Sequence, residues 1–367
     1  MRRFSNPIGI GRRTLLLGLA ASAAGPVRAQ GFAGLASPAD GFALPDPAYR
    51  LTFPADHGPH PAFRTEWWYL TATLTDAKGR ECGLQWTLFR SALRPDVTEG
   101  WDSPQVWMAH AALTSADTHV YAERFARGGI GQAGVTADPF DAWIDDWSMT
   151  GAPGTGLDTL TVTARGAEFA YDIALTADGP LVLQGQQGFS QKAPDGRASH
   201  YYSQPAYAAE GTVTFPGEDP VAVTGRGWLD REWSSAPMAD GQRGWDWFAL
   251  NFLDGTQMMA ARMRSETAPY TAATWIDAEG RATPYPDGAV TFEPLATTQV
   301  AGQTVPTRWR VTLPARGTDV TVDALNPGAW MGTAFPYWEG PVTLTDTATG
   351  ELAGRGYLEM TGYGEPG

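Results

Sequence analysis

Apolar and polar residues alternate along most of the chain after about residue 60, and this period of two is typical of strands buried on one face. One segment carries its apolar residues at Trp68, Leu70, Ala72 and Leu74. The stretches "CGLQWTLF", "EFAYDIAL" and "TRWRVTL" alternate in the same way, and no segment shows a long helical period. The pattern predicts an all-β protein built from antiparallel strands.

Turn residues separate these alternating runs. Asp254-Gly255 is a strong hairpin signal, and the turn dipeptides Lys78-Gly79, Asp178-Gly179 and Glu279-Gly280 lie between further apolar runs. The polar, small-residue stretch "SSAPMADGQRG" lies between two aromatic strands, at residues 234–244. Because 367 residues exceed what one core usually organises, we expect an N-terminal domain over residues 42–236 and a C-terminal domain over residues 237–367.

The first 29 residues have the pattern of an export signal. Arg12 and Arg13 precede an apolar run at residues 15–24, and the small-residue cleavage pattern Val27-Arg28-Ala29 follows. The apolar run is too short to span a bilayer comfortably, so we expect no stable membrane insertion. Both the twin-arginine route and the general secretory route fit, and either predicts a periplasmic or secreted protein.

Charge and cysteine content narrow the function classes. The formal net charge is −14, and loss of the five arginines in residues 1–29 would make the mature chain more acidic still. Such a surface repels phosphate backbones, so we expect no nucleic-acid partner. Cys82 is the single cysteine, which excludes an intramolecular disulfide.

Ionisable side chains fall on apolar strand faces at three places. By strand parity, Glu66 shares a face with Trp68, Asp246 shares one with Phe248, and His110 lies among apolar neighbours. A carboxyl group buried there must be paired or neutral. A neutral acid among aromatic rings could protonate an alkene while the rings stabilise the carbocation.

The alternative is structural pairing of these acids. Arg64 lies two residues before Glu66 on the same parity and could neutralise it. In "LDREWSS" the three consecutive charges Asp230, Arg231 and Glu232 could satisfy one another. Both interpretations stay open at the level of the sequence.

Five ordered motifs carry a resemblance to a known family: "TEWWYLTATL", "YYSQP", "GWLDREWSS", "GWDWFALNF" and "GRGYLEMTGY". The chain resembles the lipocalin-like family that includes the carotenoid 1,2-hydratases (hydroxyneurosporene synthases), and in particular its exported AttH-like branch, also described as predicted secreted hydrolases. The resemblance implies two consecutive lipocalin-like antiparallel β-barrel domains, with a cavity and an inter-domain region lined by these motifs.

The motifs and the parity argument together define candidate site residues. The candidate catalytic acids are Asp246, Asp230 and Glu66. Arg231 stands where the hydratases commonly have a histidine. The candidate ligand-binding residues are Trp67, Trp68, His110, Tyr202, Arg231, Trp233, Trp245 and Trp247.

Other chemistries fit the sequence less well. There is no G-x-S-x-G run, and Ser203 lies too close in sequence to His200 for a typical triad. His57 and His60 have the spacing of a metal pair, but we expect them in an ordinary surface loop, with no metal and no cofactor.

The leading hypothesis is therefore an exported protein that binds a hydrophobic, isoprenoid or lipid-like molecule and adds water to a C=C bond. The alternative is a non-catalytic carrier, or an accessory protein that contacts components of an ABC transport system.

Overall fold

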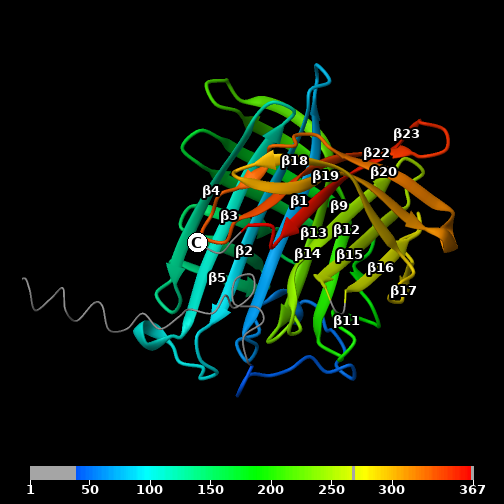
Figure 1. Cartoon of the computed structure of the whole chain (residues 1–367). Coiled ribbons are helices and arrows are strands. Elements are labelled where there is room, and N and C mark those ends of the chain that lie inside the picture. Colours follow the sequence, from blue (N-terminus) through cyan, green and yellow to red (C-terminus); the bar gives the residue numbers. More distant parts are fainter. Residues whose placement is uncertain (1–38, 267–268, 365–367) are drawn as a thin grey trace, which may run out of the picture. The chain divides into compact units, whose positions relative to one another are not determined.

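The computed structural model describes residues 39–266 and 269–364, and two curled antiparallel sheets account for most of them. Figure 1 shows the first sheet in blue to green and the second in yellow-green to red. The all-β prediction is confirmed. The predicted export signal lies outside the described residues.

The first sheet contains 13 strands, of which β10 and β11 pair only with β12. The strands are β1 (Thr65–Asp76), β2 (Glu81–Ala92), β3 (Gln105–Ser115), β4 (His119–Arg127), β5 (Ala133–Ala137), β6 (Phe140–Ile144), β7 (Trp147–Gly151), β8 (Thr159–Arg165), β9 (Ala170–Ala177), β10 (Val182–Leu183), β11 (Phe189–Gln191), β12 (Ala198–Thr214) and β13 (Val221–Ser234). Its main path runs β4-β3-β2-β1-β13-β12-β9-β8-β7-β6-β5. The sheet curls into a nearly closed barrel. Its two ends come together where Arg124 of edge strand β4 donates a hydrogen bond to the Ile144 carbonyl of β6.

The second sheet contains ten strands and forms a half-barrel. The strands are β14 (Gln242–Phe252), β15 (Gln257–Ser265), β16 (Tyr270–Ile276), β17 (Ala282–Tyr285), β18 (Thr291–Val300), β19 (Gln303–Leu313), β20 (Thr318–Ala324), β21 (Trp330–Met331), β22 (Tyr337–Asp346) and β23 (Leu352–Thr361). The path is β17-β16-β15-β14-β23-β22-β20-β19-β18, with β21 on β22. Three short 3-10 helices complete the described elements: η2 (Ala55–His57), η3 (Gly100–Asp102) and η4 (Pro314–Arg316).

Strand parity separates two kinds of buried surface in each sheet. On β1 the even residues, among them Trp68 and Leu70, point into the core of the first sheet. The odd residue Tyr69 instead joins a cluster shared by both sheets, together with Trp228 of β13 and Trp247 of β14. The alternation therefore gives each central strand an inner face and a face toward the other sheet.

Side chains of the two sheets meet along this shared surface. Tyr69 donates a hydrogen bond to Glu339 of β22 at 2.6 Å, and Arg355 of β23 pairs with Glu81 of β2. The sheets also approach closely at Gly83, where an added Cβ atom would lie 2.8 Å from Cγ of Pro341. Only glycine fits this contact without displacing the opposite strand.

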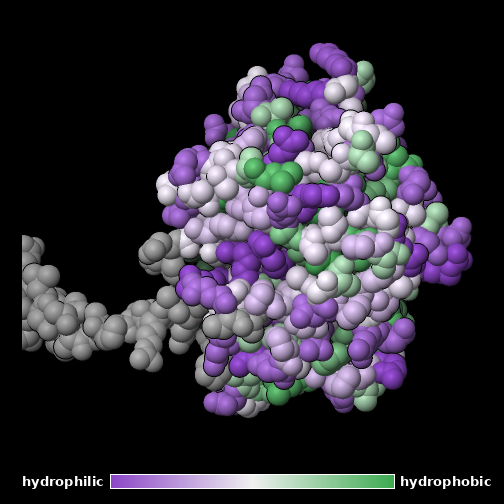
Figure 2. Space-filling view, turned by 45° about the vertical axis from the view of Figure 1, so that its right-hand side comes forward, coloured by the Kyte–Doolittle hydropathy of each residue, from purple (hydrophilic) through white to green (hydrophobic). Residues whose placement is uncertain are grey.

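The first sheet ends at Ser234 and the second begins at Gln242, while the domain limits 42–236 and 237–367 remain predictions. Cys82 is a free, buried thiol. Polar residues cover most of the face shown in Figure 2, and hydrophobic residues appear there in small patches. Among the described residues, no helix has the length and apolar character needed to cross a bilayer.

Candidate functional site

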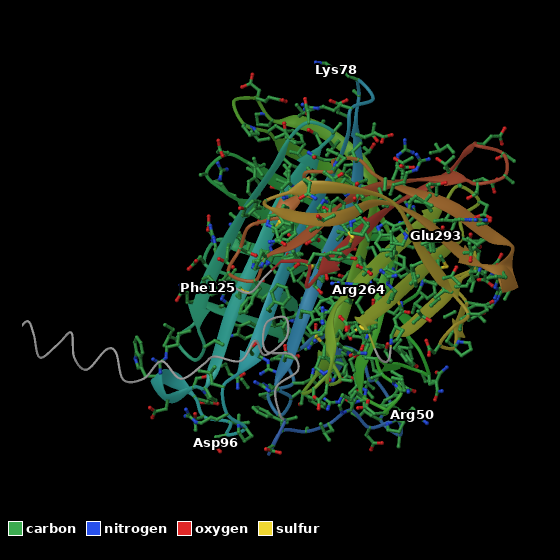
Figure 3. The ribbon with its side chains drawn as sticks, viewed as in Figure 1. Arg50, Lys78, Asp96, Phe125, Arg264 and Glu293 are labelled. Carbon is green, nitrogen blue, oxygen red and sulfur yellow. The ribbon has the colours of Figure 1, made fainter. Side chains whose placement is uncertain are left out.

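A cavity of about 470 Å³ opens between the two sheets, and we call it the inter-sheet cavity. Its walls are mainly apolar and aromatic, which is typical of a small-molecule site. The aromatic lining residues are Trp67, Tyr69, Phe89, Trp107, Phe125, Tyr201, Trp245, Trp247, Phe335 and Tyr337. Leu93 and Phe125 line the cavity and are also 72% and 56% exposed, so they mark its mouth; Figure 3 labels Phe125 on β4.

Three carboxyl groups also line this cavity: Asp230 and Glu232 from β13, and Glu359 from β23. Asp230 and Glu359 have no ion pair with any cation in residues 39–266 and 269–364. Glu232 differs, because the Lys192 ammonium lies 2.9 Å from its Oε1 atom. The cavity thus combines two acids without a cation and one acid in an ion pair.

Asp230 is buried and surrounded by neutral donors. Tyr201 donates to its Oδ2 atom at 2.6 Å, Trp228 Nε1 donates to Oδ1 at 2.7 Å, and Ser203 also donates to Oδ1. Burial raises the pKa of Asp230 to about 7, and the charge of Glu232 adds to this, although the three hydrogen bonds oppose it. Asp230 therefore gains and loses a proton near neutral pH.

A chain of hydrogen bonds connects Asp230 to the second sheet. Trp247 of β14 donates from Nε1 to the Tyr201 oxygen at 3.1 Å, and Tyr201 in turn contacts Asp230. Because Trp247 already supplies a hydrogen to the Tyr201 oxygen, the Tyr201 proton is directed to Asp230 when that carboxylate is ionised. When Asp230 is neutral, its carboxyl O–H can instead donate a hydrogen bond to the Tyr201 oxygen.

Glu359 is the corresponding acid on the second sheet. Trp245 Nε1 donates to its Oε1 atom, and burial together with the charges of Asp230 and Glu232 raises its pKa to about 7. Behind it, burial and the charge of Glu359 raise the pKa of Glu339 well above its ordinary range. Carboxyl groups from both sheets thus share this region, and each favours the neutral form of the next.

Of the predicted site residues, the inter-sheet cavity brings together Asp230, Trp67, Trp245 and Trp247. His110 lies behind the cavity wall, where it bonds the Tyr337 hydroxyl at 2.9 Å and Glu123 at 3.1 Å. Burial lowers the pKa of His110, which favours its neutral form.

Glu66 lies in a second location, inside the first sheet, with the predicted residues Trp68, Tyr202, Arg231 and Trp233. It forms ion pairs with Arg90 and Arg231, both fully buried. Burial alone would raise the pKa of Glu66, but the two guanidinium groups outweigh burial and hold it well below its usual range. Glu66 is consequently an ionised structural anion near neutral pH.

These contacts correct two details of the sequence interpretation. The partners of Glu66 are Arg90 and Arg231, which come from neighbouring strands, and not Arg64. Asp230, Arg231 and Glu232 do not satisfy one another, because successive residues of a strand point to opposite faces. Arg231 turns inward to Glu66, while Asp230 and Glu232 turn toward the cavity.

Asp246 occupies the inner face of the second sheet and does not line the inter-sheet cavity. Arg262 lies 2.7 Å from its Oδ2 atom and Arg264 lies 3.4 Å from Oδ1. Tyr363 donates to the same Oδ1 atom at 2.9 Å. Figure 3 labels Arg264 on β15. Parity placed Asp246 with Phe248 correctly, but that face is the core of the sheet.

The expectation of a surface loop for His57 and His60 is wrong. His57 is buried and bonds the Tyr202 hydroxyl at 2.7 Å. The His60 ring stacks on Trp233 with centroids 4.0 Å apart and contacts Asp56 at 3.0 Å. In the part of the chain that the structure describes, no group of three or more metal-ligating side chains comes together.

Sequence reasoning missed Glu359, Tyr69, Tyr201 and Lys192 as cavity residues. Glu359 alternates with Leu358 and Met360 in "GRGYLEMTGY", so parity would have placed it opposite the core face. No local signal identifies Lys192, which reaches the cavity from the segment after β11.

An acid-lined, aromatic cavity between two curled sheets defines a two-sheet lipocalin-like protein. Within that class, the AttH-like family model matches residues 44–363, and the chain belongs to the AttH-like family. An AttH protein of Nitrosomonas europaea is 33% identical, and the match covers 88% of this chain and 100% of that one with a TM-score of 0.78. No curated protein matches significantly.

Two further solved structures share the fold. Kievitone hydratase of Nectria haematococca is 16% identical, with 88% of this chain and 98% of that chain covered and a TM-score of 0.64. The protein CghA, solved with Sch210972, is 14% identical, with coverages of 89% and 98% and a TM-score of 0.54. These likenesses establish the lipocalin-like, hydratase-type fold and confirm the resemblance read from the motifs.

Proposed function

We propose that this protein binds a hydrophobic small molecule in the inter-sheet cavity and that Asp230 protonates a C=C bond of it, so that water adds. The observation that carries the proposal is the cavity-lining Asp230 carboxyl, whose pKa burial raises to about 7. A general acid is most effective when its pKa lies near the working pH. Kievitone hydratase, by its name, hydrates its substrate on the same fold.

The reaction balances with residues of this chain alone. Asp230 gives its proton to one alkene carbon, directly or through Tyr201, which forms a C–H bond and leaves a carbocation. The rings of Trp67, Trp245 and Trp247 line the cavity and can stabilise that positive charge. Water forms the new C–O bond, and its released proton returns to the Asp230 carboxylate.

The site of action follows from the predicted export signal. We propose that the protein meets its ligand in the periplasm or outside the cell, after removal of residues 1–29. A carrier without catalysis, including one that contacts an ABC transport system, would use the same cavity but leave its ligand unchanged.

The test compares Asp230→Asn with the wild type on a panel of acyclic isoprenoids in heavy-oxygen water. We expect a tertiary alcohol carrying the label from the wild type, and a loss of at least about 100-fold in turnover for Asp230→Asn. Tyr201→Phe removes the relay but keeps the acid, so it should lose less activity. Mass spectrometry of the labelled alcohol measures the turnover of the wild type and of both variants.

Asp246→Asn is the matched control, because it neutralises a buried aspartate that lies outside the cavity. Assayed at a temperature where it stays folded, it should keep most of the turnover. If the wild type binds panel members but forms no labelled alcohol, the carrier interpretation replaces the catalytic one.

A further inference from the structure

We propose that the ligand of the inter-sheet cavity carries a positive charge, an ammonium-type head on an apolar body, held between Asp230, Glu359 and the indole rings of the wall. The inference rests on the ligand-binding half of the proposed function and names the class of ligand.

The first argument is the balance of charges around the cavity. Asp230 and Glu359 face it from opposite sheets without a cationic partner among the described residues. Hydroxyl and indole donors hold both carboxyl groups in place, as Tyr201 does for Asp230 and Trp245 does for Glu359. Two oriented carboxyl groups without a counter-ion, in a space of about 470 Å³, form a receptor for a cation.

The second argument is the aromatic wall. Trp67, Trp245 and Trp247 line the same space as the two acids. Indole faces attract organic cations, and clusters of aromatic rings are the usual recognition site for quaternary ammonium groups. A purely neutral ligand would contact the rings but would gain no charge attraction from the ionised acids.

The third argument is that the wall already binds an ammonium group in this way. Lys192 Nζ lies 2.9 Å from Glu232 and 4.8 Å from the centroid of the Tyr201 ring. The carboxylate and the ring together hold this cation at the edge of the cavity. On the second sheet, a carboxyl group and an aromatic ring also lie side by side, since Trp245 Nε1 donates to Glu359 Oε1.

Binding of a cation should depend on pH, because it requires ionised carboxyl groups. The titratable and charged groups that face Asp230 and Glu359 from the packed elements are Arg64, Tyr69, Lys192, Tyr201, Glu232, Tyr337 and Glu339. Burial raises the pKa of Tyr69, Tyr201 and Tyr337 well above the ordinary tyrosine range, so these three groups stay neutral between about pH 6 and 8.5. The change in affinity over this range therefore reports the carboxyl groups.

The experiment uses two probes of equal shape, benzyltrimethylammonium and its neutral carbon isostere neopentylbenzene. Titration is followed by tryptophan fluorescence of the folded protein. At about pH 8.5 we expect the cation to bind at least about tenfold more tightly than the isostere, and at about pH 6 we expect a much smaller difference.

The variants Glu359→Gln and Asp230→Asn should each weaken binding of the cationic probe by about tenfold and leave binding of the neutral isostere unchanged. Glu168→Gln is the control, because it removes the same charge from the exposed surface. Thermal melts confirm that each variant is folded, and the two variants serve as independent tests of one site.

Equal affinity of the two probes in the wild type at both pH values overturns the inference. If both probes bind equally well, the proposed function is still supported, but for a neutral ligand. Failure of both probes to bind contradicts the inference and also counts against the inter-sheet cavity as the ligand site.

Discussion

Buried carboxyl groups have opposite surroundings in two regions of this molecule. Inside the sheets, Glu66 pairs with Arg90 and Arg231, and Asp246 pairs with Arg262. Between the sheets, the partners that the described residues give Asp230 and Glu359 are hydroxyl and indole groups. The pKa of Glu66 falls below its usual range, while burial raises that of Asp230 to about 7.

This difference distinguishes carboxyl groups that stabilise the fold from carboxyl groups that can transfer a proton. An acid paired with arginines stays ionised at every working pH and cannot donate a proton. An acid held by neutral donors keeps its proton until about neutral pH and can transfer it. The burial of a carboxyl group alone therefore says little about its role. Whether its partners are cations or neutral donors determines whether it can donate a proton.

The largest stability effect should follow Glu66→Gln. This change leaves two buried guanidinium groups without their anion, and breaking such a pair costs roughly 3–5 kcal/mol in the free energy of unfolding. Urea denaturation measures the loss. Glu81→Gln is the control, because it breaks a half-exposed pair with Arg355 and should cost no more than about 1 kcal/mol. Similar losses for both variants would contradict the structural role of Glu66.

A smaller loss should follow Asp246→Asn. Its partners Arg262 and Arg264 are 22% and 20% exposed, so their charges can still reach water. We expect the free energy of unfolding to fall by about 2 kcal/mol. The same denaturation series measures it. A loss as large as that of Glu66→Gln would show that partial exposure does not relieve the unpaired arginines.

A further effect is a change in how the free energy of unfolding varies with pH. The pKa of Asp230 rises from 3.8 to about 7 on folding, so the folded state holds a proton that the unfolded state releases between these values. Stability from this group is complete below about pH 4, falls as the pH rises to about 7, and is constant above. For Glu66 the sign is reversed, because its pKa falls on folding and stability is lost as the pH drops below about 4.5.

Asp230→Asn should therefore flatten the decline between about pH 4 and 7 by up to about 1.4 kcal/mol per pH unit. Unfolding curves collected across this range give the slope. An unchanged slope would mean that Asp230 is already ionised in the folded protein at low pH, which would also remove it as a proton donor.

The sequence predicts the fold well because its evidence is local. Alternation in β1 and β14 places Glu66 and Asp246 on buried faces, and both side chains are fully buried in the structure. Hairpin dipeptides such as Asp254-Gly255 join neighbouring strands as expected, with Gly255 at a φ of 86°.

The site is less predictable because its evidence is not local. Parity identifies a buried face but not which of two buried faces encloses a cavity, so Asp246 and Asp230 look equivalent in the sequence. Arg90 lies 24 residues from Glu66, and the pairing of β2 with β1 brings them together. The charge of Asp230 acts on Glu359 only because the two sheets pack together, and strand periodicity does not encode that packing.

The close contact at Gly83 also has a geometric consequence for the whole interface. Gly83 and Pro341 touch near one end of β2, whereas Ser91 near the other end of the same strand lines the cavity. At this end of β2 the approach of the two sheets therefore depends on a residue that has no side chain. Gly83 itself does not line the cavity. We therefore expect that a larger residue at this position would change the size of ligand that the cavity accepts, although it would not touch the ligand.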